Sequence, residues 1–144
     1  MIKIICIGKL KEEYLIKLVN DYKNRINKYH KLEIIELKDS NIKDEAIEIK
    51  KHISNRDYII VLDIYGSKLN SIELSKKIDN WLMNNSNIIF IIGGSDGIDD
   101  LVKNISNYKL SFSDLTIPHG LFRGLLLEQI YRSFKILNNE TYHK

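Results

Sequence analysis

The residues that most constrain the fold are Asn87–Gly97, with the sequence NIIFIIGGSDG. The five apolar residues Ile88–Ile92 show no polar alternation, which is typical of a strand buried on both faces of a parallel sheet. Gly93, Gly94 and Gly97 follow, so the backbone can turn sharply and a ligand can approach it closely. In open α/β sheets, ligands bind at the carboxyl ends of central strands. The stretch therefore fits two readings, a nucleotide-type ligand site or a tight strand-to-helix turn without a ligand.

Strand and helix patterns alternate along the rest of the chain. Apolar runs predict four further strands at Ile2–Ile7, Leu32–Leu37, Tyr58–Asp63 and Tyr108–Phe112. Apolar residues at helical spacing predict helices at Leu10–Tyr29, Lys43–Asn55, Ser71–Met83 with Ser71 as its N-cap, Ile98–Ser106 and Leu121–Leu137. This alternation predicts a single α/β domain over residues 1–144, with a mainly parallel sheet that helices cover on both faces.

Composition and cysteine content restrict the class of protein. At 144 residues the chain can bury one core, and its apolar (44%) and charged (28%) fractions are ordinary for a globular protein. No apolar run is long enough to cross a membrane, and the N-terminal residues lack a signal-peptide pattern. Cys6 is the only cysteine, so no internal disulfide can form, and its place in a predicted strand favours a buried thiol over a nucleophile. We therefore expect a cytoplasmic protein without a membrane partner.

Basic residues are concentrated at both ends of the chain. Met1–Lys31 carries eight Lys and Arg against three acids, and Pro118–Lys144 carries four against two. If folding brings these segments together, they form a face that can contact phosphate. A solvated lysine-rich helix accounts for the first segment equally well.

The last predicted helix is apolar nearly all the way round. Such a helix must be buried on more than one side, so we expect a homodimer in which a second subunit supplies the additional cover. His119 and Arg123 share one face near its start, whereas Glu128, Arg132 and Lys135 lie together on another, with Glu128 and Arg132 spaced for an ion pair. Polar groups on an apolar helix need partners or a substrate, and a purely structural Glu–Arg pair is the alternative.

Small and polar residues gather in three loops, each after a predicted strand. The loops are Asp63–Lys68, Gly93–Gly97 and Ser111–Pro118. If their strands are parallel neighbours, the loops meet at one sheet edge, where backbone groups can read an adenine and a ribose between Leu62, Leu115 and Ile117. Ordinary turns without a ligand are the alternative. The four histidines have neither zinc-ligand spacing nor cysteine partners, so we expect no metal.

Long motifs carry a resemblance to a known family. They are IKIICIGKLKEEYL, LDIYGSKLNSIEL, FIIGGSDGI, LSFSDLTIPH, LLLEQIYRSFKI and the terminal YHK. In this order, and over essentially the whole chain, they resemble the RlmH (YbeA-type) group of SPOUT-class RNA methyltransferases. The resemblance implies a mainly parallel sheet flanked by helices, with the C-terminal part tied into a deep trefoil knot, a rare exception to un-knotted folding. It also implies a homodimer whose assembly completes the active site.

The resemblance implies that the knotted loops bind S-adenosyl-L-methionine. The cofactor contacts carried over from the family fall on Leu62, Gly93, Phe112, Ser113, Asp114, Leu115, Thr116 and Ile117. These residues belong to the strand ends and the three loops that meet at one edge of the sheet if their strands are parallel neighbours. Asp114 departs from the family pattern, and it is expected either to contact the methionine amino group or to face solvent.

The implied substrate is a pseudouridine in helix 69 of large-subunit ribosomal RNA, methylated at N3 in the assembled ribosome. Tyr142 and His143 are expected to reach the methyl acceptor across the dimer, with His143 as proton acceptor or positioner. Arg132 and Arg123 would stabilise negative charge or hold phosphate. Further substrate contacts are expected from His119 and Lys144.

Two other functional classes fit parts of the sequence. A non-catalytic, ribosome-associated RNA-binding module would keep the fold without requiring S-adenosylmethionine, but the intact glycine turn and terminal YHK argue against such decay. A flavodoxin-type nucleotide-binding protein would need a phosphate-binding loop after the first strand. Gly8-Lys9-Leu10 is too short a segment for that role.

Overall fold

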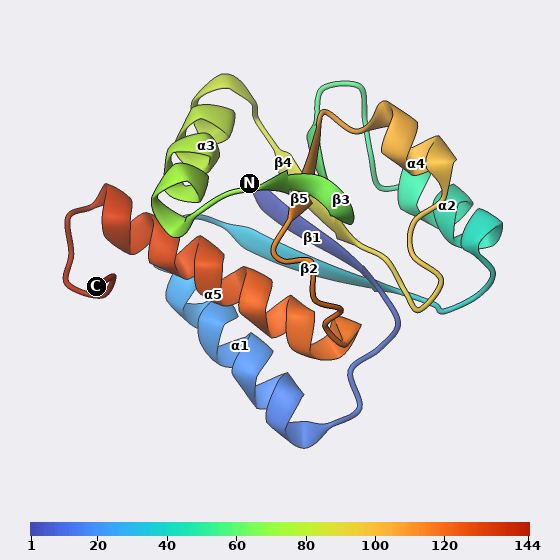
Figure 1. The fold of residues 1–144 in the computed structure, drawn as a ribbon, viewed down its shortest axis with the longest axis horizontal. Coiled ribbons are helices and arrows are strands. Elements are labelled where there is room, and N and C mark those ends of the chain that lie inside the picture. The colour runs from blue at the N-terminus through green and yellow to red at the C-terminus, as the bar shows by residue number, and fades with distance from the viewer.

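Five parallel strands form the centre of the computed structural model, which describes residues 1–144 (Figure 1). The strands are β1 (Ile2–Ile7), β2 (Leu32–Leu37), β3 (Tyr58–Lys68), β4 (Ile88–Ile92) and β5 (Tyr108–Ser111). The helices are α1 (Glu13–Asn27), α2 (Ile42–Lys50), α3 (Ser71–Asn84), α4 (Asp100–Ile105) and α5 (His119–Leu137). The strand order is β2-β1-β4-β3-β5, and every neighbouring pair is parallel. The predicted parallel α/β architecture is confirmed.

β4 occupies the middle of the sheet, between β1 and β3. All five of its residues are buried, because its two faces point into two separate cores. Ile88, Phe90 and Ile92 belong to the larger core. Ile89 and Ile91 belong to the smaller one. Burial on both faces explains why the strand is an unbroken apolar run.

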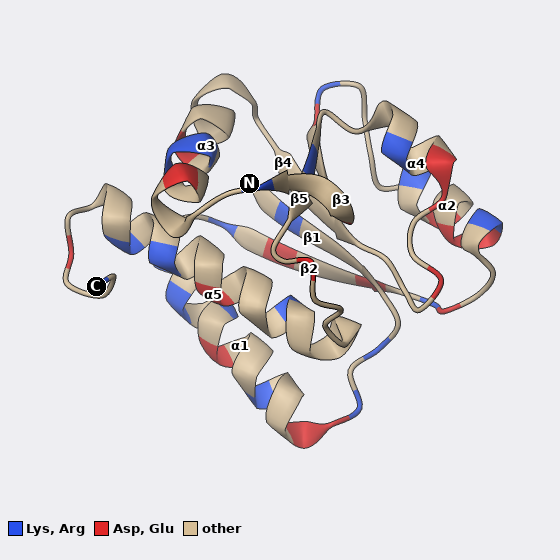
Figure 2. Ribbon diagram, viewed as in Figure 1, with Lys and Arg blue, Asp and Glu red and all other residues tan.

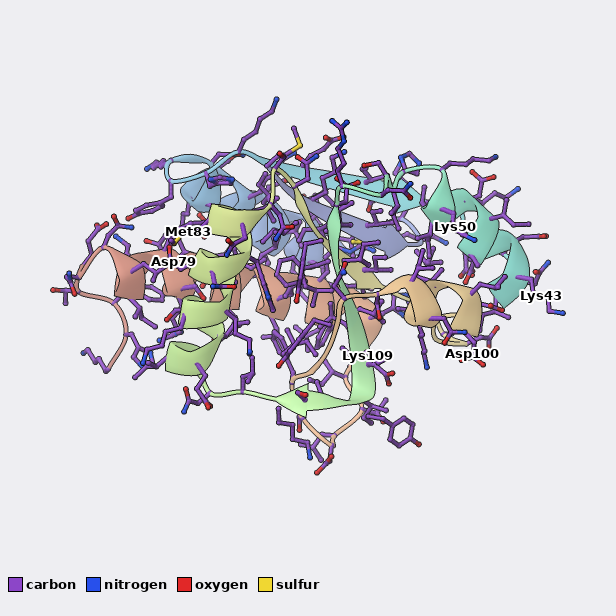
Figure 3. The ribbon with its side chains drawn as sticks, turned by 90° about the horizontal axis from the view of Figure 1, so that it is seen from above. Lys43, Lys50, Asp79, Met83, Asp100 and Lys109 are labelled. Atoms are coloured by element: carbon purple, nitrogen blue, oxygen red, sulfur yellow. The ribbon has the colours of Figure 1, made fainter.

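Helices cover both faces of the sheet. α1, α3 and α5 pack over the larger core, while α2 and α4 pack over the smaller one (Figure 1). Trp81 of α3 anchors the larger core, with its ring centroid 5.3 Å from that of Tyr58 and 6.3 Å from that of Phe90. In the view from above, Lys43 of α2 and Asp79 of α3 lie on opposite sides of the molecule (Figure 3). None of the helices combines the length and apolar composition that crossing a membrane requires.

The helices α1 and α2 are shorter than predicted, since α1 begins at Glu13 instead of Leu10 and α2 ends at Lys50 instead of Asn55. Two further differences have a visible physical reason. β3 continues to Lys68 instead of ending at Asp63, because Ser67 and Lys68 pair with β5 again after an irregularity that follows Leu62. The N-cap of α3 is Asn70 and not Ser71. The Asn70 side chain accepts a hydrogen bond from the Glu73 amide at 2.8 Å, and the Glu73 carboxylate accepts one from the Asn70 amide at 2.9 Å. This reciprocal pair is a capping box.

α5 lies between α1 and α3 beneath the sheet (Figure 1). Leu126, Leu127 and Ile130 are fully buried in the larger core. Leu121 and Leu125 stay 38% and 37% exposed, so part of the apolar surface of α5 is left uncovered within one protomer. The trefoil knot that the family resemblance implies is consistent with this topology.

Candidate functional site

A pocket of about 390 Å³ lies at the carboxyl ends of the three neighbouring strands β4, β3 and β5. The three predicted loops meet there, together with the start of α5. This volume is within the range of small-molecule sites, which run from about 300 to 1,000 Å³. The lining residues are Leu62, Asp63, Ile64, Tyr65, Ile92, Gly93, Gly94, Ser95, Gly97, Ile98, Lys103, Leu110, Ser111, Phe112, Ser113, Leu115, Thr116, Ile117, His119 and Phe122.

The glycine turn after β4 shapes one wall of this pocket. A Cβ on Gly93 would lie 2.6 Å from the carbonyl oxygen of Gly97 and 2.7 Å from a side-chain carbon of Ile98, closer than real Cβ atoms come. Gly97 itself has a φ of 82°, in the left-handed region that favours glycine. The turn is closed by a 3.1 Å hydrogen bond from the Gly97 amide to the Gly94 carbonyl. Glycine at position 93 is therefore required by the turn itself.

The opposite wall is apolar and comes from the end of β5 and the start of α5. Phe112 and Phe122 pack at a centroid distance of 4.8 Å, and Leu110 is fully buried behind them. The Ser113 hydroxyl accepts a hydrogen bond from the Leu115 amide at 3.0 Å, which fixes the loop between them. Apolar faces beside loop backbone groups suit a planar base joined to a polar sugar.

One ion pair lies at the edge of the pocket. The Asp63 carboxylate is only 9% exposed and lies 3.6 Å from the Lys103 ammonium of α4. Asp63 also accepts a hydrogen bond from the Tyr65 amide at 3.0 Å. Lys103 was not predicted as a pocket residue, because it lies on α4, in a separate segment of the chain. Asp114 is outside the pocket lining: its side chain is 81% exposed and pairs with Lys68, so it faces solvent.

A second polar cluster lies at the far end of α5 and is centred on the Glu128 carboxylate. Arg132 donates to Glu128 Oε1 through Nε at 3.0 Å and Nη2 at 2.6 Å, which confirms the predicted ion pair. Tyr142 donates to the same oxygen at 3.0 Å, and Gln129 donates to Oε2 at 2.9 Å. Hydrogen bonding to Glu128 raises the pKa of Arg132, so this side chain stays cationic.

The C-terminal tail is seated on this cluster. Arg132 Nη1 lies 3.1 Å from His143 Nδ1. Because a guanidinium can only donate, Nδ1 is the acceptor, and a neutral imidazole then carries its proton on Nε2. The Tyr142 ring packs edge-on against Tyr131 at 4.9 Å. Burial, together with hydrogen bonds to Tyr22 and Glu128, raises the pKa of Tyr142, so its phenol remains a donor.

Arg123 does not reach the surface where an RNA contact was expected. Its side chain is 2% exposed, and it donates to Glu36 Oε2 at 2.6 Å and to the Gly8 carbonyl at 3.1 Å. It therefore ties α5 to the ends of β1 and β2, and within one protomer its side chain is buried. His119, the first residue of α5, is exposed and lines the pocket. Lys144 is exposed at the end of the tail.

The two basic segments do come together, since α1 packs against α5 (Figure 2). Arg25 of α1 and Lys135 of α5 both lie 5.5 Å from the ring centroid of Tyr131. Lys135 also lies over the ring of Tyr29 at 5.7 Å. The mixture of cations and aromatic rings is concentrated beside the tail and not beside the pocket.

The start of α5 lines the pocket, whereas the C-terminal tail leaves the other end of the helix (Figure 1). His119 in the pocket and Arg132 beneath the tail are separated by thirteen helical residues, or about 20 Å at 1.5 Å per residue. The tail folds back on α1 and α5, so His143 stays at that end. One protomer alone therefore does not bring the expected catalytic residues to the pocket.

Comparison with solved structures supports the fold. The tRNA (m1G37) methyltransferase from Aquifex aeolicus has a TM-score of 0.54 at 17% identity, and the match covers 91% of this chain and 69% of that one. The SpoU methyltransferase AviRb from Streptomyces viridochromogenes has a TM-score of 0.51 at 8% identity, covering 98% of this chain and 62% of that one. At these identities the likeness shows the fold alone.

Sequence comparison is more specific. Ribosomal RNA large subunit methyltransferase H from Clostridium botulinum (strain Alaska E43 / Type E3) is 47% identical over 157 residues, covering 99% of this chain and 99% of that protein. The protein of the same name from Caldicellulosiruptor saccharolyticus is 42% identical over 154 residues, covering all of both chains. The family model described as "Predicted SPOUT methyltransferase" matches residues 1–143. Together these matches show that the chain belongs to the SPOUT methyltransferase family.

Proposed function

We propose that this protein methylates N3 of a pseudouridine in helix 69 of large-subunit ribosomal RNA, in the assembled ribosome and therefore in the cytoplasm. The observation that carries the proposal is the full-length identity of 42–47% to proteins named ribosomal RNA large subunit methyltransferase H. The specific nucleotide rests on the family resemblance of the terminal YHK and the FSDLTIPH loop.

The methyl donor is S-adenosyl-L-methionine, which SPOUT methyltransferases generally use. The pocket residues fit such a ligand: Leu62, Leu115 and Ile117 offer apolar surfaces for an adenine, and loop backbone groups are available for its polar edge. When bound, the cofactor supplies an electrophilic methyl group. The task of the loops is to hold that group and N3 at reacting distance.

His143 is best suited to positioning the target base by donating a hydrogen bond to it. With Nδ1 held by Arg132, the proton of the neutral ring lies on Nε2, where it can hydrogen-bond an oxygen of the target base. N3 carries a proton in the free base, and once that proton has passed to water, negative charge spreads onto the neighbouring carbonyl oxygens. The Nε2 donor and the Arg132 cation stabilise this charge. Of the two roles expected for His143, the geometry favours positioner over proton acceptor.

A homodimer follows from the same proposal. Arg132, on which His143 is seated, lies about 20 Å along α5 from His119 in the pocket of its own protomer, so we infer that the tail of one protomer reaches the pocket of its partner. The half-exposed Leu121 and Leu125 near the pocket end of α5 offer an apolar surface for that second copy.

The test combines cofactor binding with methyl transfer. Calorimetric titration with S-adenosylmethionine should show saturable binding that Leu115→Glu weakens at least tenfold, because this exposed side chain lines the pocket without supporting the core. Gly93→Val should also lose binding, with far-UV circular dichroism to check its fold. Ribosomes from cells lacking this methylation should then accept labelled methyl from the wild type and not from His143→Ala.

Two results would overturn the proposal. If the wild type binds no cofactor, even with ribosomes present, the non-catalytic RNA-binding alternative replaces it. If it binds cofactor but labels free RNA or another nucleotide, the assigned substrate is wrong.

A further inference from the structure

The C-terminal tail is redirected immediately after α5 by a specific helix cap. Asn139 has a φ of 54° and is the only non-glycine residue in the left-handed region. Its amide donates to the Ile136 carbonyl at 3.1 Å, and the Glu140 amide donates to the Lys135 carbonyl at 2.9 Å. These two bonds form a Schellman motif, which turns the chain back along the helix.

Glu140, the residue after this turn, connects three parts of the fold. Its Oε1 accepts a hydrogen bond from the Tyr29 hydroxyl at 2.9 Å. Its Oε2 accepts one from the Lys135 ammonium at 3.0 Å. Tyr29 follows α1 and stacks on Phe134 at a centroid distance of 5.7 Å, so it is a fixed anchor. Hydrogen bonds from Lys135 and Tyr29 lower the pKa of Glu140, which keeps the carboxylate ionised at neutral pH.

Residues downstream of Glu140 reach their partners only if this turn is held. Tyr142 and His143, two and three residues further on, contact Glu128 and Arg132. Thr141, between Glu140 and Tyr142, is exposed and makes no side-chain hydrogen bond. The course of the tail is therefore set by the cap at Asn139 and the contacts of Glu140, before the proposed reactive residues.

We propose that Glu140 is a positioning residue for methyl transfer: through Tyr29 and Lys135 it holds the tail so that Tyr142 and His143 are presented in one arrangement. This inference rests on the proposed function, in which the tail contacts the methyl acceptor. Glu140 itself touches neither cofactor nor acceptor. Loss of the Glu140 contacts should lower kcat, because a tail that they do not hold is less often in the reactive geometry.

The experiment compares variants under saturating ribosome and cofactor. Glu140→Ala should lower kcat about tenfold while leaving the Kd for S-adenosylmethionine within twofold. The contacts of Glu140 with Tyr29 and Lys135, which we call the clasp, lie at the far end of α5 from the pocket. Glu140→Gln keeps an oxygen acceptor for Tyr29 and should recover much of the loss. Tyr29→Phe removes only the hydroxyl, and combining it with Glu140→Ala should cost little more than Glu140→Ala alone.

Glu48→Ala is the matched control, since the Glu48 side chain is 47% exposed against 41% for Glu140 and pairs with Lys51 at the end of α2, on the other face of the sheet. It should leave kcat unchanged. Nuclear magnetic resonance relaxation of the 141–144 amides supplies an independent readout: these amides should become more mobile in Glu140→Ala and not in Glu48→Ala.

His143→Ala, measured in the same assay, separates the two levels of the proposal. If His143→Ala is fully active, the tail has no role in catalysis and the proposed function of the tail fails. If His143→Ala is inactive but Glu140→Ala retains wild-type kcat, or if its tail amides stay rigid, the clasp is wrong while the proposed function stands.

Discussion

Replacing Glu36 with alanine would test the buried ion pair that ties α5 to the sheet. Glu36 Oε2 accepts hydrogen bonds from Arg123 Nη1 at 2.6 Å and from the Leu10 amide at 3.1 Å. The Arg123 side chain is 2% exposed, and without the carboxylate it keeps only its bond to the Gly8 carbonyl. A buried charge that loses its partner costs about 3–5 kcal/mol. Because Glu36 is itself 35% exposed, we expect the lower end of that range, about 3 kcal/mol.

The measurement is urea and thermal unfolding followed by circular dichroism. A loss of this size should lower Tm by about 10 °C in a chain of this length. Glu48→Ala removes an exposed ion pair of similar length, 2.7 Å to Lys51, and should cost less than about 1 kcal/mol. If Glu36→Ala destabilises no more than Glu48→Ala, the Arg123 charge is solvated in the native protein and the burial argument is refuted.

Two further predictions concern stability. Asn70→Ala should lower the free energy of unfolding by about 1 kcal/mol in the same urea experiment, because it removes one half of the capping box of α3; an unchanged value would mean that water replaces the cap. Burial raises the pKa of the Cys6 thiol to about 12 from an ordinary value of 9.0, so between these values only the unfolded chain releases the proton. Ionisation of Cys6 should therefore add no pH dependence to stability below about pH 9, and above it the free energy of unfolding should fall by up to about 1.4 kcal/mol per pH unit. Cys6→Ala should lack this component, and equal slopes in both proteins would contradict the assignment.

The strands could be predicted because buried strands consist of runs of apolar residues. β4 is buried on both faces, and its unbroken apolar run is therefore visible without any tertiary information. The extension of β3 was not visible, because Ser67 and Lys68 are polar and join the sheet only through pairing with β5. The same holds for the cap of α3: Asn70 and Ser71 are both good capping residues, and the choice depends on which side chain meets the Glu73 amide.

The pocket was predictable from topology, and the role of Arg123 was not. Loops after neighbouring parallel strands share one sheet edge, so spacing along the chain was enough to group them. Arg123 shares a helix face with His119 in sequence, but its partner Glu36 lies 87 residues earlier. Helical periodicity tells which residues share a face and not which face is buried, and a buried arginine therefore looked like a surface one.

α5 links the two halves of the proposed site and explains why they are separated. At its start it supplies Phe122 to the pocket and Arg123 to the sheet, and the Arg123 contacts fix that end of the helix. Further along it supplies Glu128 and Arg132, which hold the tail through Tyr142 and His143. The rigid helix keeps Arg132 about 20 Å from His119, so a tail that stays seated on Arg132 does not reach the pocket of its own protomer. If the tail is catalytic, the pocket that it serves therefore belongs to a second copy of the chain, and loss of dimerisation should abolish methyl transfer.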